Sequence, residues 1–203
     1  MKCNKKNFSS FKTADALKRL QIRNFSEWNL EFTPLPPSEF FKEHLQRLKK
    51  FDLTISERAK ESLIDAICQE VIVRHEHLKV WKSAPLETDD MIGVVDYLIA
   101  RDQRYLDTPL LCVAEAKKDN FEQGLAQCLV EMKACQWKNE QAGLNLEIHG
   151  IVTNGTGWQF YKLSQDGQVW ESPAFGLSRT EDILGGLHYI FTQCEEQLNA
   201  VIN

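Results

Sequence analysis

The pattern of apolar and polar residues divides the chain into a helical start and a longer part that mixes helices and strands. Apolar spacing predicts short helices over 11–20 and 39–50, and the proline-rich segment between them ends any helix. From Ser56 a longer helix follows, with an apolar face that includes Leu63 and Ile67. We therefore expect residues 1–52 to form a helical N-terminal extension and residues 53–203 to form one domain.

Three strand-like runs come next, at 78–87, 92–100 and 109–117. The last two are apolar at odd and even positions alike, which is typical of central strands covered on both faces. A helix is then expected over about 120–138, followed by a hairpin turned at Asn154-Gly155, another strand and a final helix from Thr180. This order predicts an α/β fold in which a mixed β-sheet is flanked by helices on both faces.

Composition narrows the class of protein. With 203 residues, 43% of them hydrophobic, the chain can fill one core. Its net charge of -5 argues against a protein that coats nucleic acid through a global positive field, but it allows a local basic cleft. Six cysteines without a C-x-x-C pair indicate free thiols in a reducing cytoplasm and no structural zinc. The chain has no signal-peptide pattern and no apolar run long enough for a membrane span, so we expect neither export nor membrane insertion.

Three charged residues interrupt the apolar strand runs. Glu115 and Lys117 stand two positions apart at the end of the third run, so their side chains project from the same face, roughly 6.5 to 7 Å apart. If the second run pairs beside the third, Asp96 comes level with Glu115. Two carboxylates that close repel each other unless a cation neutralises them, and Mg²⁺ is commonly held by one or two carboxylates. The pattern predicts that a metal and a phosphate meet at these strand ends.

The E-x-K spacing is weak on its own, because an ion pair at a strand end has the same pattern. A second example, Glu131 with Lys133, falls inside a predicted helix, where strand alternation does not apply, and we do not expect it at the site. Elsewhere in the chain, His75 and His77 lack the H-E-x-x-H spacing of a zinc protease, and we expect both at the protein surface.

Three segments together resemble the PD-(D/E)XK nuclease superfamily, particularly the branch similar to the N-terminal nuclease domains of type I restriction subunits. They are GVVDYLIA, CVAEAKK and the helix opening NFEQGLAQCLVEM, and the resemblance spans about 56–163. Val95 stands where many members have Pro, a departure that is also common in branches reading G-x-x-D.

The resemblance implies a restriction-endonuclease-like core and assigns roles to its charged residues. It implies that Asp96, Glu115 and the carbonyl of Ala116 hold Mg²⁺, for which Mn²⁺ can substitute, and that Lys117 is the catalytic lysine. On the second helix, Gln123 and Gln127 lie one turn apart, and the match favours Gln127 as the residue facing the site. Amides on the helix surface are the alternative.

Many such nucleases also use a Glu on the first helix, and two candidates remain. The segment SERAK resembles the E-x-x-R motif of the restriction-subunit relatives, with Glu57 as the acid and Lys60 in place of the Arg. Helical spacing independently puts Glu70 at the centre of the apolar stripe, where a buried carboxylate needs a partner. We favour Glu57 on the motif.

The resemblance implies a Mg²⁺-dependent nuclease, a hydrolase of phosphodiester bonds in DNA, acting in restriction, defence or repair. DNA is then the expected partner, no membrane partner is expected, and assembly into a homo-oligomer stays open. The alternative keeps the fold but drops the reaction: a catalytically inactive nuclease-fold module that binds nucleic acid or a partner protein.

Overall fold

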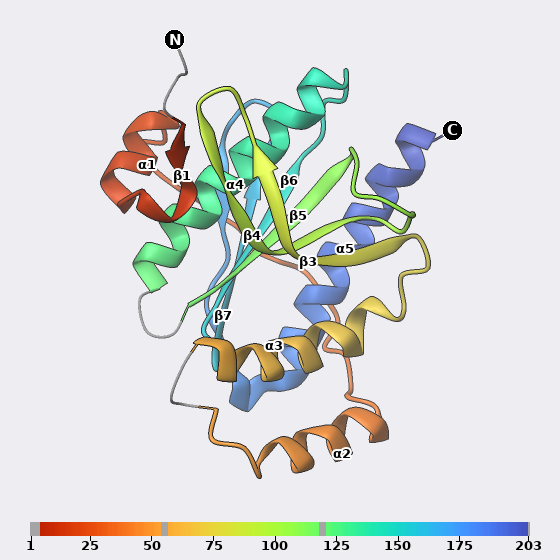
Figure 1. Ribbon diagram of the computed structural model, residues 1–203. Helices are drawn as coiled ribbons and strands as arrows, with labels where there is room; N and C mark the ends of the chain where they lie inside the picture. Colours follow the sequence, from red (N-terminus) through yellow and green to blue (C-terminus); the bar gives the residue numbers. More distant parts are fainter. Residues whose placement is uncertain (1–4, 54–56, 118–120, 203) are drawn as a thin grey trace.

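The computed structural model describes residues 5–53, 57–117 and 121–202, which form a mixed α/β fold (Figure 1). The five helices in this part of the chain are α1 (Thr13–Arg19), α2 (Glu39–Leu48), α3 (Glu57–Ile72), α4 (Phe121–Gln141) and α5 (Thr180–Ile202). The nine strands are β1 (Lys6–Asn7), β2 (Ser26–Glu27), β3 (Leu78–Glu87), β4 (Met91–Arg101), β5 (Leu110–Ala116), β6 (Ile148–Thr153), β7 (Gly157–Leu163), β8 (Val169–Glu171) and β9 (Phe175–Gly176). Two short 3₁₀ turns, η1 (Phe8–Ser10) and η2 (Leu177–Arg179), complete the described elements.

The three predicted strand runs are confirmed as β3, β4 and β5. The sheet follows the order β1-β4-β5-β6-β7-β8-β2, while β3 pairs with β4 and β9 pairs with β7. β5 and β6 are parallel, whereas β4 is antiparallel to both β3 and β5. Parallel neighbours need a crossover connection, and α4 supplies it by packing against β5 and β6.

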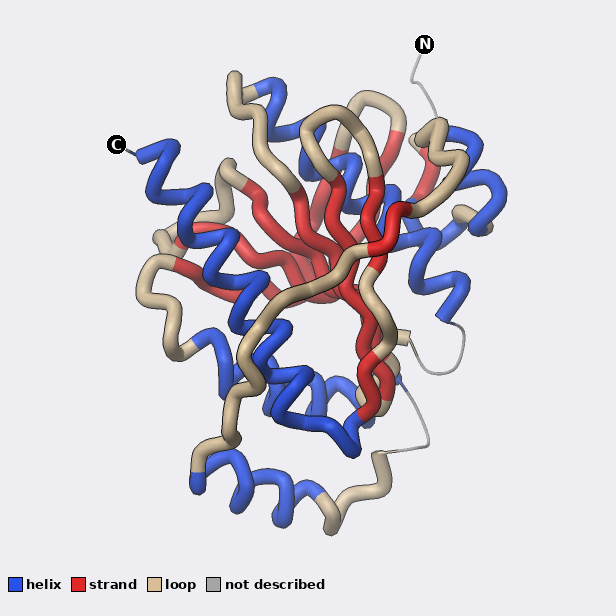
Figure 2. The backbone as a smooth tube through the Cα atoms, turned by 180° about the vertical axis from the view of Figure 1, so that it is seen from behind, coloured by secondary structure: helices blue, strands red, loops and turns tan. Residues whose placement is uncertain are grey.

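Helices cover both faces of the sheet, as the apolar runs predict. Tyr97 and Ile99 of β4 pack in one core with α3 and α5, while Leu98 between them packs in a second core with α4. Figure 2 shows α5 running diagonally across the sheet on the first face. All seven residues of β5 are buried, so any charge on this strand lies inside the protein.

The N-terminal extension joins the sheet at two places. β1 pairs with β4 and β2 pairs with β8, both in parallel, so the extension contains short strands as well as the predicted helices. Between β2 and α2 the chain passes along α5 as the loop that crosses the sheet in Figure 2. A Cβ atom at Gly185 would lie 2.5 Å from the carbonyl oxygen of Thr33, so this close approach requires a glycine in α5.

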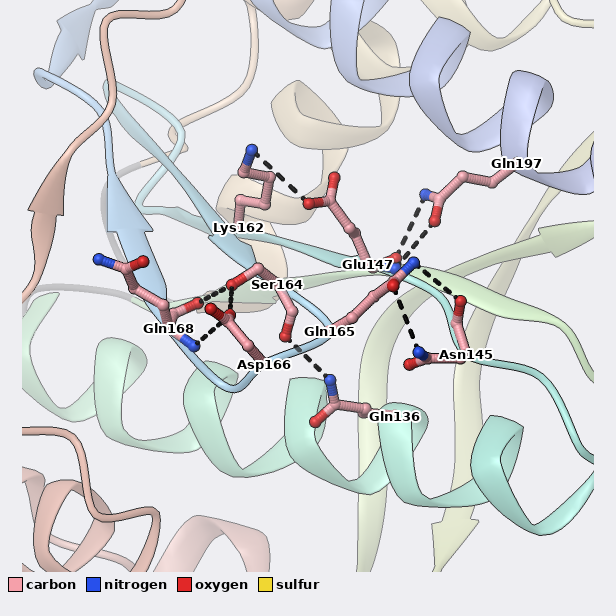
Figure 3. A network of polar contacts seen from close by, with 9 residues as sticks. All are labelled: Gln136, Asn145, Glu147, Lys162, Ser164, Gln165, Asp166, Gln168 and Gln197. Atoms are coloured by element: carbon pink, nitrogen blue, oxygen red, sulfur yellow. Dashed lines mark hydrogen bonds and ion pairs between the residues drawn. The ribbon is translucent and has the colours of Figure 1, made fainter.

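A polar network around the turn between β7 and β8 ties α4 and α5 to the same end of the sheet (Figure 3). The Gln136 amide donates to the carbonyl of Ser164 at 3.1 Å. On the other side, the Gln197 side chain accepts from the backbone N–H of Glu147 and donates to its carbonyl, at 2.9 and 3.2 Å. These bonds satisfy backbone groups at strand ends, which is a structural use of polar side chains.

The described cysteines are free thiols, as expected. Cys68, Cys112, Cys128, Cys135 and Cys194 are free and buried, while Cys3 lies outside the described residues. Burial raises the pKa of the Cys68 thiol to about 12, so this thiol stays protonated. Among the described helices, none is both long and apolar enough to cross a membrane.

Candidate active site

Asp96 and Glu115 lie beside each other on neighbouring antiparallel strands. The register of β4 and β5 ends with the pair of Tyr97 and Ala114, and Asp96 and Glu115 are the next residues on the two strands. Successive side chains alternate between the faces of a sheet, so these two leave the same face. Asp96 also binds the partner strand, since its Oδ2 accepts a hydrogen bond of 3.0 Å from the backbone N–H of Ala116. The two carboxylates are thus brought to one place, on the face that α4 covers.

Glu115 is a completely buried carboxylate with a partner on each oxygen. Its side chain is 0% exposed, and the Nζ atom of Lys117 lies 2.5 Å from Oε1. The amide nitrogen of Gln127 donates to Oε2 at 2.9 Å. A buried carboxylate needs such neutralisation, because burial alone penalises its charged form.

Lys117 extends the β5–β6 pairing and lies under the start of α4. Its backbone N–H donates to the carbonyl of Thr153 at 2.9 Å. A Cβ atom at Gly124 would lie 3.0 Å from the Cγ of Lys117, so the absence of a side chain there makes room for the lysine stem. With 16% of its side chain exposed, Lys117 is the member of the ion pair that reaches toward solvent.

Gln127 faces the candidate site, whereas Gln123 is exposed. Gln127 is buried and uses its one amide nitrogen twice, donating to Glu115 and to Glu131 at 2.9 Å each. The position favoured by the family resemblance is therefore the one that contacts Glu115.

Glu131 was not expected here, and the structure corrects that expectation. Its carboxylate is fully buried and shares the Gln127 amide with Glu115. Burial, reinforced by the charge of Glu115, holds the pKa of Glu131 well above its ordinary value. Within the described residues, neither Oε2 of Glu131 nor Oε1 of Gln127 has a hydrogen-bond partner. The signal that could have found this residue is its spacing of four from Gln127 and eight from Gln123, which puts three polar residues along one helix face.

The two candidate helix acids have different surroundings. Glu57 begins α3, and its side chain lies outside the part of the chain that the structure describes. The first turns of α3 approach the turn that follows β6, since a Cβ at Gly155 would lie 3.8 Å from the Cβ of Lys60. Glu70 lies thirteen residues further along α3, about 20 Å away by helix rise. Both of its oxygens accept hydrogen bonds of 2.8 Å from Ser38, one from the backbone N–H and one from the hydroxyl. Glu70 is thus occupied in holding the start of α2.

His75 is a further correction, because it is buried rather than exposed. Its Nδ1 lies 3.0 Å from Oε2 of Glu195 and its Nε2 lies 3.0 Å from Nδ1 of His188. Burial, together with neighbouring His75 and Arg74, lowers the pKa of His188. This cluster joins the end of α3 to α5 and is separate from the Asp96–Glu115 pair.

The donor set at Asp96 and Glu115 fits a hard divalent cation. Two carboxylates and a backbone carbonyl at Ala116 are all oxygen ligands, and Mg²⁺ usually completes its octahedron with water. No group of three or more His, Cys, Asp or Glu side chains arranged for a metal occurs in residues 5–53, 57–117 and 121–202. A centre with two carboxylates does not need such a group. The Lys117 ammonium neutralises Glu115 in this structure.

Comparison with known proteins adds little beyond the geometry. No protein-family model matches the chain. The chain is similar to Crinkler effector protein 1 of Rhizophagus irregularis, with 28% identity over 96 residues. That similarity covers 44% of this chain, and the matched part spans 20% of the length of the effector.

Proposed function

We propose that this protein is a Mg²⁺-dependent nuclease that hydrolyses phosphodiester bonds in DNA, with a restriction-endonuclease-like core. The observation that carries the proposal is the fully buried Glu115, which contacts both Lys117 and Gln127 at the end of the β4–β5 pairing, where Asp96 is the next residue of β4. A fold stabilised only by its apolar core has no need for this charge at the centre of its sheet. The similarity to Crinkler effector protein 1 gives no support for a particular reaction, because the name of that protein describes no activity.

Asp96, Glu115 and the carbonyl of Ala116 would hold the Mg²⁺ or Mn²⁺ ion. Bound there, the ion would stabilise charge on the phosphoryl group and lower the pKa of a bound water. The residues of the chain supply the rest. The ammonium of Lys117 can pair with a phosphate oxygen or orient a water molecule, because it carries its charge at the partly exposed end of the cluster. Gln127 fixes the orientation of the Glu115 carboxylate through its Nε2.

One feature favours the alternative, a nuclease-fold module that binds without cutting. Both oxygens of Glu115 are engaged by side chains of the protein itself, so the buried carboxylate is neutralised without a metal. Such a module would bind nucleic acid or a partner protein and would leave DNA intact.

The test is cleavage of plasmid, linear duplex and single-stranded DNA with Mg²⁺ or Mn²⁺. We expect Asp96→Asn to lose cleavage together with metal binding, measured by Mn²⁺ titration. Lys117→Met should lower cleavage about 10²- to 10³-fold, the usual effect of removing one electrostatic stabiliser, while it keeps metal binding. Asp102→Asn and Lys82→Met are matched controls that should leave cleavage unchanged. Asp102 forms its ion pair with Lys79, and Lys82 pairs with Asp65 of α3 on the face of the sheet that α4 does not cover. If wild-type protein cuts none of these substrates with either ion, the binding module replaces the nuclease.

A further inference from the structure

Positive charge is concentrated in one short segment of an otherwise acidic chain. Residues 5–25 contain six Lys or Arg and one acidic residue, out of 24 basic and 29 acidic residues in the chain. The rest of the protein is therefore more acidic than the net charge of -5 suggests. A ligand with a phosphate backbone is repelled by most of this surface and attracted to this segment.

The fold sets this segment beside the candidate active site. Ile92 of β4 pairs with Glu87 of β3 and also with Asn7 of β1, so β1 lies on the edge of β4 that β3 leaves open. β5 uses that same edge further along β4. Asp96 stands between these two pairings, four residues beyond Ile92, which is about 13 Å along a strand.

Two contacts bring the segment still closer to the site. The Phe8 ring packs over β4, since a Cβ at Gly93 would lie 2.4 Å from it. The Thr13 hydroxyl donates to the carbonyl of Glu122 at 3.0 Å, which fixes α1 beside the first turn of α4 (Figure 1). The hollow between them is lined in part by Lys12 and Gln123, and the next residue after Gln123 is Gly124, against which Lys117 packs.

Three of the six basic residues of the segment contact other groups of the protein, and the other three have no such side-chain contact in the described residues. Lys5 binds Glu87 and the carbonyl of Thr88 at 2.6 Å each, and Arg19 forms an ion pair with Asp90, so these two fasten the segment to the turn between β3 and β4. Lys6 lies over the Phe11 ring. The remaining three, Lys12, Lys18 and Arg23, are exposed and have no side-chain partner within the described residues.

We propose that this segment, residues 5–25, is the surface on which the phosphate backbone of DNA docks beside the site, through Lys12, Lys18 and Arg23. The choice of DNA rests on the proposed function. An anionic membrane is the poorer partner, because insertion into the headgroup region needs an apolar face directed outward. The large apolar side chains that are exposed in the described residues all lie outside this segment.

The experiment compares two triple variants that remove equal charge. The segment variant is Lys12→Gln, Lys18→Gln and Arg23→Gln. The control variant is Lys49→Gln, Lys50→Gln and Arg104→Gln, three exposed residues outside the segment and without a side-chain partner in the described part of the chain. Binding to a fluorescent 30-base-pair duplex is measured by anisotropy in EDTA, so that no cleavage intervenes, over a series of KCl concentrations. Thermal unfolding of both variants checks that each remains folded.

We expect the segment variant to bind at least about tenfold more weakly at low salt, while the control stays within about twofold of wild type. The slope of log affinity against log salt should fall in magnitude by about 2 to 3, since each phosphate contact contributes about 0.9. The proposal would be overturned if both variants bind the duplex as tightly as wild type, or if both lose the same affinity. It would also be overturned if the two variants differ only in binding to vesicles that contain phosphatidylserine. Binding through the segment without cleavage in Mg²⁺ would support this inference while the nuclease proposal fails. If the segment variant cleaves DNA as fast as wild type, the nuclease proposal stands and this inference fails.

Discussion

Buried carboxylates at two places in this protein have opposite surroundings. Glu70 on α3 has both oxygens satisfied by Ser38, with two hydrogen bonds of 2.8 Å. On α4, Glu131 shares a single amide nitrogen with Glu115, and its Oε2 has no hydrogen-bond partner among the described residues. Buried polar atoms in proteins are nearly always paired, so an incomplete set points to a ligand, a water or an ion that completes it. The contrast separates a structural carboxylate from the carboxylates of the candidate site.

The largest expected effect on stability that tests this contrast comes from removing the ion pair at Lys117. In metal-free protein, Lys117→Met leaves the fully buried Glu115 without its ammonium, and removing one partner of a buried pair costs about 3 kcal/mol or more of unfolding free energy. Urea unfolding in EDTA measures this loss. Lys82→Met, which removes a partly exposed ion pair with Asp65, should cost about 1 kcal/mol or less.

A second substitution tests the cause of that loss. Adding Glu115→Gln to Lys117→Met removes the uncompensated charge, and most of the lost unfolding free energy should return. If the single variant unfolds like wild type in EDTA, Lys117 is not what neutralises Glu115, and the contrast with Glu70 fails.

Glu70 offers the next largest effect, on stability alone. Glu70→Ala removes the acceptor of two hydrogen bonds from Ser38 and should cost about 2 kcal/mol of unfolding free energy, as expected for bonds to a charged group. Cleavage of DNA by the folded variant should equal that of wild type. Loss of cleavage with unchanged urea unfolding would instead identify Glu70 as the helix acid and exclude Glu57.

The central strands could be predicted because their signal is local. Continuous apolar runs located β4 and β5 to within a residue at each end, and the interruptions in those runs were Asp96, Glu115 and Lys117. Whether these three residues lie close together depends on the register of the two strands. The sequence predicts their proximity only on the condition that the two runs are neighbours in the sheet. The structure meets that condition.

The features that could not be predicted depend on contacts between distant residues. β1 and β2 have two residues each, too few for any periodicity, and they form only because β4 and β8 offer free edges. Ser38 and Glu70 are 32 residues apart, so their pairing leaves no pattern in the sequence. The E-x-K spacing of Glu131 carries information only on a strand, whereas on α4 the position of Glu131 depends on its packing against Gln127 and Glu115.

Glu131 provides the smallest and most specific test of the contrast. Its pKa in the folded protein is raised above the ordinary value of 4.5, chiefly by burial and then by the charge of Glu115. The folded state therefore binds this proton more tightly than the unfolded state does. The stability that the proton contributes is complete below pH 4.5 and is lost as the pH rises toward the folded-state pKa.

Glu131→Gln removes this dependence on pH and keeps an oxygen that can accept from Gln127. We expect the variant to be more stable than wild type by about 1 kcal/mol at pH 7.5, the usual size of a stabilising substitution, with the difference vanishing near pH 4.5. Urea unfolding of both proteins at several pH values between 4.5 and 8 measures it. A difference that is constant with pH would mean that Glu131 titrates alike in the folded and unfolded states. The site would then end at Gln127.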